Sequence, residues 1–307
     1  MATYTTYDTV GIKEDVSDII SNIAPTKTPF QTMIGKGKTT SRKFEWLEDS
    51  LRAVQTNAKV EGFEASDATL TPPTLRSNYT QIMEKTIKVA ATEDAVDQYG
   101  RAKETAYQLS KAAEELKRDK EHAYVGLAQT ATLGDSTSTA RLTASAASMV
   151  TNSTNRYYTG AATPLGGTTG TAGALTENAI LAAGQAVYNQ GGEASVLMIK
   201  PSDSLIVAGF TGSSGRAREF SGDTKKVVNV VDLYVSPFGE YKVVLNRFLK
   251  STDAWLLDPE MWEDVTLRAW TREPLAKSGD SSKHMIVGEY GLKHKNFAGD
   301  ALITNLT

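Results

Sequence analysis

The chain contains 307 residues, 40% of them hydrophobic, and its 33 lysines and arginines nearly balance 36 aspartates and glutamates, for a net charge of -3 at pH 7. A dedicated nucleic-acid-binding protein or a protein of anionic membrane surfaces would show a basic excess, so this balance argues against both classes. The absence of cysteine excludes disulfides, thiolate metal sites and cysteine nucleophiles. We also find no signal-peptide pattern and no apolar run long enough to span a membrane, so no membrane partner is expected.

Residues 1–41 have the pattern of an arm rather than of a domain. An amphipathic helix is predicted over Glu14–Ile23, and Pro25 and Pro29 then favour extended backbone. A helix of about three turns cannot form a core alone, so the arm must pack on another surface. That surface is either the rest of the same chain or a neighbouring chain, and the residues leave both open.

Residues 42–91 contain two stretches in which apolar and polar residues alternate, as in β-strands. The first is Arg42–Glu48 and the second is Tyr79–Ala90, with the polar segment Arg52–Ser77 between them. We expect the two stretches to pair as a hairpin. Such a hairpin has too little apolar surface to fold by itself, so it is expected to lie across a partner.

Residues 92–174 begin with the longest helical pattern in the sequence. Apolar residues recur at steps of three and four and predict a helix over Ala102–Gln129, about 42 Å long at 1.5 Å per residue. The predicted buried stripe consists of Tyr99, Ala102, Ala106, Leu109, Ala113, Leu116, Ala123 and Leu127. Thr130–Ala174 is rich in Ser, Thr, Gly and Ala, and is either a flexible loop or an ordered surface.

Residues 175–257 read as a separate α/β unit. A helix is predicted over Leu175–Gln190 with Thr176 as its N-cap, followed by the buried strand Val196–Ile199. A short helix capped by Ser202 or Asp203 and the hairpin strands Val227–Val235 and Tyr241–Leu245 follow. Residues 258–307 return to strands, which we predict over Val265–Trp270 and His284–Lys295.

The sequence carries few patterns that are typical of a catalytic or metal site. His284 and His294 lie about 33 Å apart on one strand at 3.3 Å per residue, too far to share a metal. The glycine-rich loop Gly209–Arg218 lacks the Lys-Ser/Thr ending of a phosphate-binding P-loop. Glu260 and Glu263 could form a glycosidase pair, but a solvated turn is the simpler interpretation. These patterns favour a structural protein over an enzyme, without cofactor or metal.

Taken together, the segments resemble the tailed-phage major capsid proteins of the Hong Kong 97 type, an α+β fold. The resemblance covers nearly the whole chain and is weakest over Thr130–Ala174. It is carried by Thr9–Phe30, Phe44–Trp46, Asn78–Ile82, Ala106–Leu109, Glu115–Asp119 and Glu273–Asp280.

The resemblance implies a role for each segment. Residues 1–41 would be the N-terminal arm, 42–91 the extended loop, 92–174 the peripheral domain with its spine helix, 175–257 the axial domain, and 258–307 the returning strands of the peripheral domain. The Gly209–Arg218 loop is a candidate for the axial tip. Predicted inter-subunit contacts are Phe30, Trp46, Arg52, Lys59, Arg76, Arg216 and Arg218.

The same resemblance implies partners and a location. Many copies, as hexamers and pentamers, would form an icosahedral virion capsid, assembled in the host bacterial cytoplasm, around double-stranded DNA held without sequence specificity. A portal, a decoration protein and a separate scaffolding protein are further implied partners, the last because the chain starts almost directly at the arm. Two alternatives stay open: a glycan-active enzyme or carbohydrate-binding module using Trp262, Trp270, Glu260 and Glu263, and a tail-tube protein, against which the long helix argues.

Overall fold

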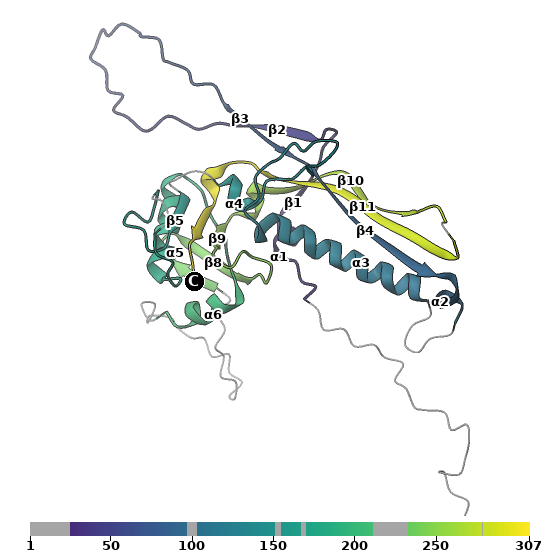
Figure 1. Cartoon of the computed structure of the whole chain (residues 1–307). Coiled ribbons are helices and arrows are strands. Elements are labelled where there is room, and N and C mark those ends of the chain that lie inside the picture. The colour runs from purple at the N-terminus through teal and green to yellow at the C-terminus, as the bar shows by residue number, and fades with distance from the viewer. Residues whose placement is uncertain (1–24, 97–102, 151–154, 167–169, 211–232, 278) are drawn as a thin grey trace, which may run out of the picture.

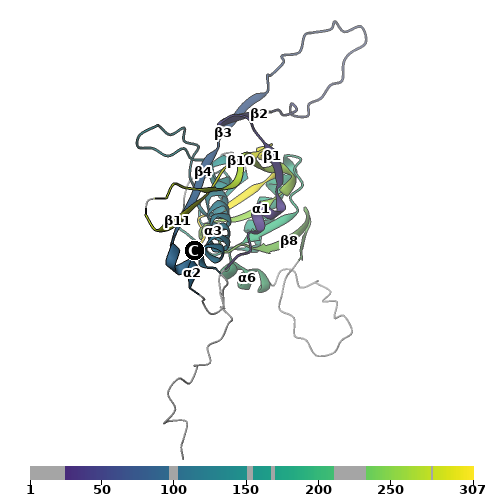
Figure 2. The same ribbon diagram turned by 90° about the vertical axis from the view of Figure 1, so that its right-hand side faces the viewer.

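The computed structural model describes residues 25–96, 103–150, 155–166, 170–210, 233–277 and 279–307 (Figure 1). These residues form a four-stranded sheet, a six-stranded sheet and a two-stranded hairpin. The long helix lies along the four-stranded sheet, and the hairpin leads away from the body into an open loop (Figures 1 and 2). No helix among these residues is long and apolar enough to cross a membrane.

The four-stranded sheet is long and narrow. Its order is β1 (Gly35–Lys38), β10 (Trp262–Pro274), β11 (Ser281–His294) and β4 (Gln81–Ala90). β1 runs parallel to β10, and the other pairs are antiparallel. Strands were predicted at both C-terminal positions, and β10 is longer than the predicted Val265–Trp270.

The long helix α3 covers one face of this sheet. It spans Glu104–Glu121, 18 residues or about 27 Å, and continues as a π-helical turn, η2, over His122–Gly126. The predicted end at Gln129 is therefore three residues too late, and the predicted positions Tyr99 and Ala102 lie outside the described residues.

The predicted phase of the helical stripe is partly wrong. Ala106 and Ala113 are exposed and Leu109 is only half-buried. The buried positions of α3 are Ala112, Leu116, Lys120 and Glu121. Two of these are charged, and each has a partner far away in the sequence, which lets it occupy a buried position. The predicted stripe left out both of these charged side chains, and its phase was rotated as a result.

The hairpin consists of β2 (Lys43–Glu48) and β3 (Thr74–Tyr79), paired from Lys43↔Tyr79 to Glu48↔Thr74. The predicted partner of β2, Tyr79–Ala90, instead forms β4 and pairs with β11. Two features explain the correction. Met83 and Val89 of β4 are buried in the body of the molecule, and the chain changes sheets at the buried Thr80.

The six-stranded sheet has the order β5, β12, β9, β6, β8, β7. Its strands are Arg156–Tyr158, Ala301–Thr304, Ala254–Leu257, Val196–Ile199, Gly239–Leu245 and Leu233–Ser236 respectively. β6, β9 and β12 are completely buried. β12 and β5 were not predicted here: the first lies in the segment assigned to the other sheet, and the second in the low-complexity stretch.

Helix α5 (Glu177–Asn189) packs on the six-stranded sheet, and its predicted N-cap is confirmed because the Thr176 side chain accepts from the Ala179 N–H at 3.2 Å. Helix α6 (Pro201–Ala208) has Lys200, not Ser202 or Asp203, at its N-cap, since Pro201 already occupies the first helical turn. Of the predicted hairpin, residues 227–232 lie outside the described residues.

Five small elements complete the described part of the fold. They are α1 (Pro29–Met33), α2 (Ala91–Ala95), α4 (Ala146–Met149), η4 (Pro259–Met261) and η5 (Phe297–Gly299). α4 belongs to the Ser/Thr/Gly-rich segment, yet its Ala146 and Met149 are buried in a core that includes Trp255 and Trp262. Part of this segment is thus core, not a flexible loop.

Candidate inter-subunit surface

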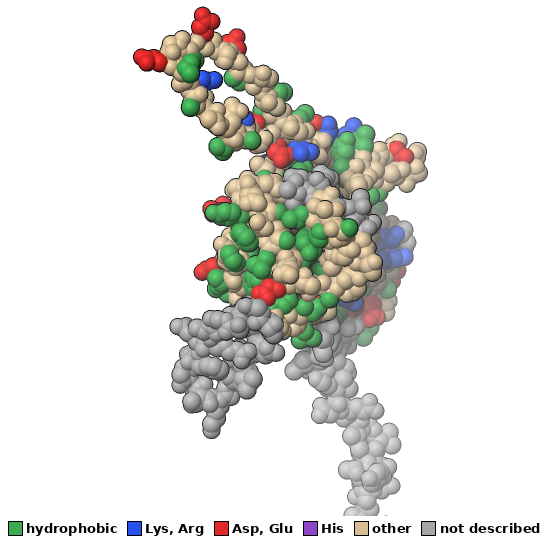
Figure 3. Space-filling view, turned by 90° about the vertical axis from the view of Figure 1, so that its left-hand side faces the viewer, with side chains coloured by type: hydrophobic (Ala, Val, Ile, Leu, Met, Phe, Trp, Pro, Cys, Tyr) green, Lys and Arg blue, Asp and Glu red, His purple; other side chains and the backbone are tan. Residues whose placement is uncertain are grey.

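Residues 49–73 connect the two hairpin strands and stand clear of the body (Figure 1). Every side chain in this loop is exposed. Figure 3 shows the loop as separate hydrophobic and acidic side chains with open space on both sides. Its large apolar side chains are between 54% and 101% exposed, and they are Leu51, Val54, Val60, Phe63 and Leu70. These side chains are left largely uncovered by their own chain, and a loop of this length without a core of its own is suited to lie on another protein.

The base of the hairpin, by contrast, is fixed by buried hydrogen bonds. The Asn78 side chain is fully buried, and its Nδ2 donates to the Leu292 carbonyl at 2.6 Å and to Thr143 Oγ1 at 3.0 Å. Its Oδ1 accepts from the Ala144 N–H at 2.8 Å. One amide side chain therefore joins the hairpin to β11 and to the segment before α4.

A second anchor lies two residues after Asn78, at Thr80, the first residue after the hairpin. The buried Glu289 carboxylate of β11 accepts from Thr80 Oγ1 at 2.7 Å and pairs with Arg268 at 3.1 Å and with Arg141. Arg141 Nε also donates to the Thr80 carbonyl at 2.6 Å. Because buried, charge-assisted bonds are the strong ones, the hairpin leaves the body at a fixed position.

Close packing holds the first hairpin strand as well. Phe44 of β2 stacks on Trp46 with 6.0 Å between ring centroids. A Cβ added to Gly291 of β11 would lie 2.6 Å from the Phe44 ring. Only glycine lets the ring pack directly on the backbone of β11.

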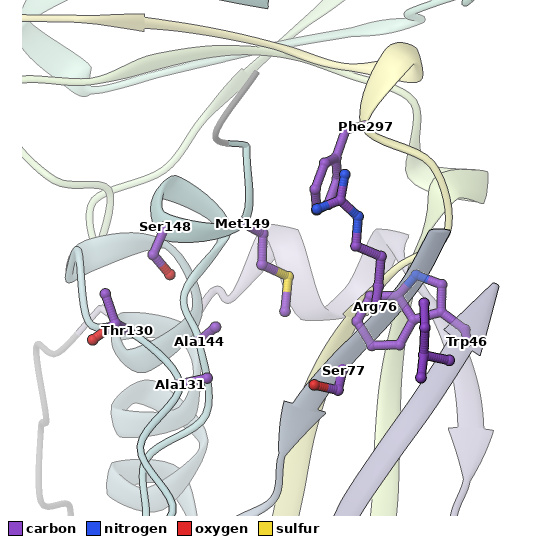
Figure 4. Close-up of a pocket in the computed structure, with 10 residues that line it drawn as sticks. Trp46, Arg76, Ser77, Thr130, Ala131, Ala144, Ser148, Met149 and Phe297 are labelled. Carbon is purple, nitrogen blue, oxygen red and sulfur yellow. The ribbon is translucent and has the colours of Figure 1, made fainter. Parts of the chain in front are cut away.

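A cavity of about 310 Å³ lies between the hairpin base and the segment around α4 (Figure 4). Met149 reaches into it from α4, and Trp46 and Arg76 line it from the hairpin. Arg76 Nε donates to Glu48 at 2.7 Å, and its guanidinium carbon lies 4.3 Å from the centre of the Phe297 ring. The cavity thus has apolar walls with a cation at its edge.

The start of α1 is fastened to the body by the buried carboxylate of Glu121. Glu121 accepts from the Phe30 N–H at 2.8 Å, from the Gln31 N–H at 2.9 Å and from Asn246 Nδ2 at 2.7 Å. Burial raises the pKa of Glu121, and these hydrogen bonds to the carboxylate oppose the rise. One side chain thereby links α1 of the predicted arm, α3 and the residue that follows β8 of the six-stranded sheet.

A model of the family described as SU10 major capsid protein matches residues 2–307. The chain belongs to this family. A curated major capsid protein of Escherichia phage Phieco32 is 31% identical over 339 residues, covering 98% of this chain and 96% of that protein. The function is therefore that of a tailed-phage major capsid protein, which forms the icosahedral shell.

Solved capsid structures share the fold of this SU10-family protein at low sequence identity. The capsid of cyanophage A-1(L) has a TM-score of 0.69 at 13% identity, covering 99% of this chain and 98% of that chain. A structure of Mycobacterium phage Bobi has a TM-score of 0.62 at 10% identity, covering 99% of both chains. These likenesses confirm the predicted α+β fold of the Hong Kong 97 type.

The predicted contact residues of the capsid protein fall into four groups. Arg52 and Lys59 are exposed on the loop, whereas Trp46 and Arg76 are half-buried around the cavity. Phe30 is completely buried in the chain's own core, 5.6 Å from Trp262 between ring centroids, so its prediction as a contact is wrong. The sequence placed Phe30 in the arm and missed its anchor on Glu121. Arg216, Arg218 and the predicted helix Glu14–Ile23 lie outside the described residues.

Two of the four residues considered for glycan chemistry, Trp262 and Glu263, are otherwise engaged in the capsid protein. Trp262 is completely buried, so it offers no platform for a sugar. Glu263 pairs with Lys293 and Lys295, both at 3.1 Å. His294 is also buried, stacked on Trp262 at 3.9 Å and hydrogen-bonded to Asp300. Within the described ranges, no group of three His, Cys, Asp or Glu side chains is placed to hold a metal.

Proposed function

We propose that residues 49–73 lie across a neighbouring copy in the shell and that this contact is needed for assembly. The observation that carries the proposal is the combination of a rigid base with an exposed apolar loop. Asn78 and Glu289 fix where the loop leaves the body, while the apolar side chains beyond it have no cover on their own chain. Burying them at about 25 cal/mol per Å² stabilises the assembly rather than the monomer.

The proposed division of labour follows the two sheets. It differs from the predicted domain bounds, because β5 and β12 come from segments assigned to the peripheral domain and β4 comes from the segment assigned to the extended loop. The four-stranded sheet with α3 would act as the peripheral domain, and the six-stranded sheet as the axial domain around the five-fold and quasi-six-fold axes. The two sheets share a hydrophobic core around Trp255 and Trp262, and this core holds them together as one subunit. We assign Trp46, Arg52, Lys59 and Arg76 to inter-subunit contacts, since all four lie on the hairpin or its loop.

The proposed partners beyond the chain itself are a separate scaffolding protein, a portal and packaged double-stranded DNA, with assembly in the bacterial cytoplasm. A net charge of -3 suits a container that holds DNA without gripping it, because binding strength rises with the number of phosphates neutralised. A decoration protein is a further candidate for the outer surface.

A loop replacement tests the assembly role. Glu48 and Thr74 are already paired, so replacing residues 49–73 by Asn-Gly closes the hairpin with a two-residue turn. We expect a subunit with unchanged circular dichroism and thermal unfolding that forms no shells, with or without a co-expressed scaffold. Negative-stain microscopy and sedimentation give the readout, beside the wild-type chain expressed in the same way as the control. Normal shells from the shortened chain would remove the loop from the assembly contacts.

A further inference from the structure

The cavity beside the hairpin is suited to bind an apolar side chain that has a carboxylate as its neighbour. Met149, Ala144 and Phe297 are all less than 10% exposed and form apolar walls. Arg76 stands at the edge with a half-buried side chain. Its Nε is used by Glu48, but its terminal nitrogens make no hydrogen bond to any residue that the structure describes. A carboxylate is the partner that a guanidinium binds best.

The loop of residues 49–73 carries an apolar side chain flanked by carboxylates. Its only turn in the described structure is Val60–Phe63, closed by a hydrogen bond from the Phe63 N–H to the Val60 carbonyl at 3.3 Å. Gly62 has φ +79° at the third position, a value that a type II turn requires and that glycine adopts without strain. The turn places Phe63 between Glu61 and Glu64, with all three side chains exposed.

We propose that the cavity of one copy receives Phe63 of a neighbouring copy, with Glu61 or Glu64 of that turn pairing with Arg76. This docking rests on the proposed function of the loop and names its receptor. The loop leads away from its own cavity, which lies at the hairpin base (Figures 1 and 4). Each copy therefore offers one turn and one cavity, and such a head-to-tail contact closes into rings in which every turn and cavity is used.

Two features of the cavity match this occupant better than a small ligand or an unrelated protein. Its volume of about 310 Å³ is at the lower end for small-molecule pockets, and it is ample for one aromatic side chain. Each subunit of a closed shell has one such cavity, so filling all of them takes one occupant per subunit. A loop from a neighbouring copy satisfies this requirement, because every copy has one loop and one cavity.

Introduced cysteines test the docking directly, because the chain has none of its own. Chains carrying Phe63→Cys are co-assembled with chains carrying Ala131→Cys, which lies exposed at the cavity. Any disulfide between the two kinds of chain is then between copies. After oxidation of purified shells, we expect a disulfide-linked dimer as a major band on a non-reducing gel. Shells of either single variant give the background.

Leu51→Cys is the matched control for Phe63→Cys. Leu51 is an exposed apolar residue of the same loop, but it lies twelve residues before Phe63, up to about 40 Å along extended chain. Co-assembly with Ala131→Cys chains should then give no dimer above background. Shells that form without the Phe63 dimer, or with an equal Leu51 dimer, overturn the docking but leave the role of the loop intact.

Wild-type shells provide a second measurement that needs no variant. Phe63 and Leu75, which lines the cavity, are both more than 50% exposed in the single chain. We expect hydroxyl-radical labelling of both to be lost on assembly. Unchanged labelling in shells refutes the docking even if the cysteine variants fail to assemble. Absence of shells from the wild-type chain with its scaffold would overturn the proposed function, and the docking with it.

Discussion

The ion pair between Lys120 and Asp264 gives a sharp prediction for the stability of the subunit. The Lys120 Nζ lies 2.7 Å from Asp264 Oδ2, and the two side chains are 7% and 6% exposed. Lys120→Met keeps the packing of the aliphatic stem but leaves the carboxylate buried with the Tyr124 hydroxyl, at 2.6 Å, as its remaining side-chain donor. Breaking a buried pair in this way costs about 3–5 kcal/mol.

At roughly 2 °C per kcal/mol for a chain of this size, the melting temperature should fall by about 6–10 °C. Thermal unfolding of the unassembled subunit, followed by circular dichroism, measures this shift. Lys117→Met, an exposed position on the same helix, serves as the control and should change stability by less than about 0.5 kcal/mol.

The double variant Lys120→Met/Asp264→Asn separates the cost of an unpaired charge from the loss of packing. Asparagine keeps an acceptor for the Tyr124 hydroxyl and removes the charge, so we expect most of the stability to return, to within about 1–2 kcal/mol of wild type. A single variant that melts within about 2 °C of wild type would refute the reasoning. So would a double variant that melts no higher than the single one.

Three further predictions concern the neighbouring packing. Leu116→Ala should destabilise the subunit by about 2–5 kcal/mol and the half-buried Leu109→Ala by less than half as much, measured by urea unfolding; equal effects would contradict the observed helical phase. Gly291→Ala should displace Phe44 and reduce the yield of shells, as counted by sedimentation, and an unchanged yield would remove this contact from the hairpin anchor. The raised pKa of Glu121 adds stability that is fully present below about pH 4.5 and is lost as pH rises through the folded-state pKa. The deficit of Glu121→Gln should therefore shrink with rising pH in thermal scans, and a growing deficit would contradict the burial.

Local features of the fold were predictable because their causes lie within a few residues. The Thr176 cap, the buried strand Val196–Ile199 and the hairpin turn between Val235 and Tyr241 each follow from neighbouring side chains, and the structure confirms them. Capping, continuous apolar character and turn chemistry need no information from distant parts of the chain.

The features that were missed depend on partners far away in the sequence. Lys120 pairs with Asp264, and Glu121 accepts from the backbone of α1, so two charged side chains that the predicted apolar stripe left out are buried. Strand Tyr79–Ala90 was paired with the wrong neighbour for the same reason, since β11 lies about two hundred residues later. Pairings at such separation leave no local pattern.

The cavity that we assign to inter-subunit contact was partly visible in the sequence. Trp46 and Arg76 were predicted as contact residues, but Met149 and Phe297 were not, because they come from segments that showed no contact pattern. The low-complexity stretch concealed its contribution, since Ala and Ser read as loop residues although their small size suits them to tight packing.

The place of β12 in the six-stranded sheet has a consequence for synthesis. β12 lies between β5 and β9, and it comes from residues 301–304. The ribosome adds about 5–20 residues per second, and β12 is synthesised after all five other strands of this sheet. A polypeptide broken off before residue 301 would leave β5 and β9 with unpaired edges. Only chains translated past that residue have a complete six-stranded sheet with which to join a growing particle, so prematurely terminated chains are excluded from the shell.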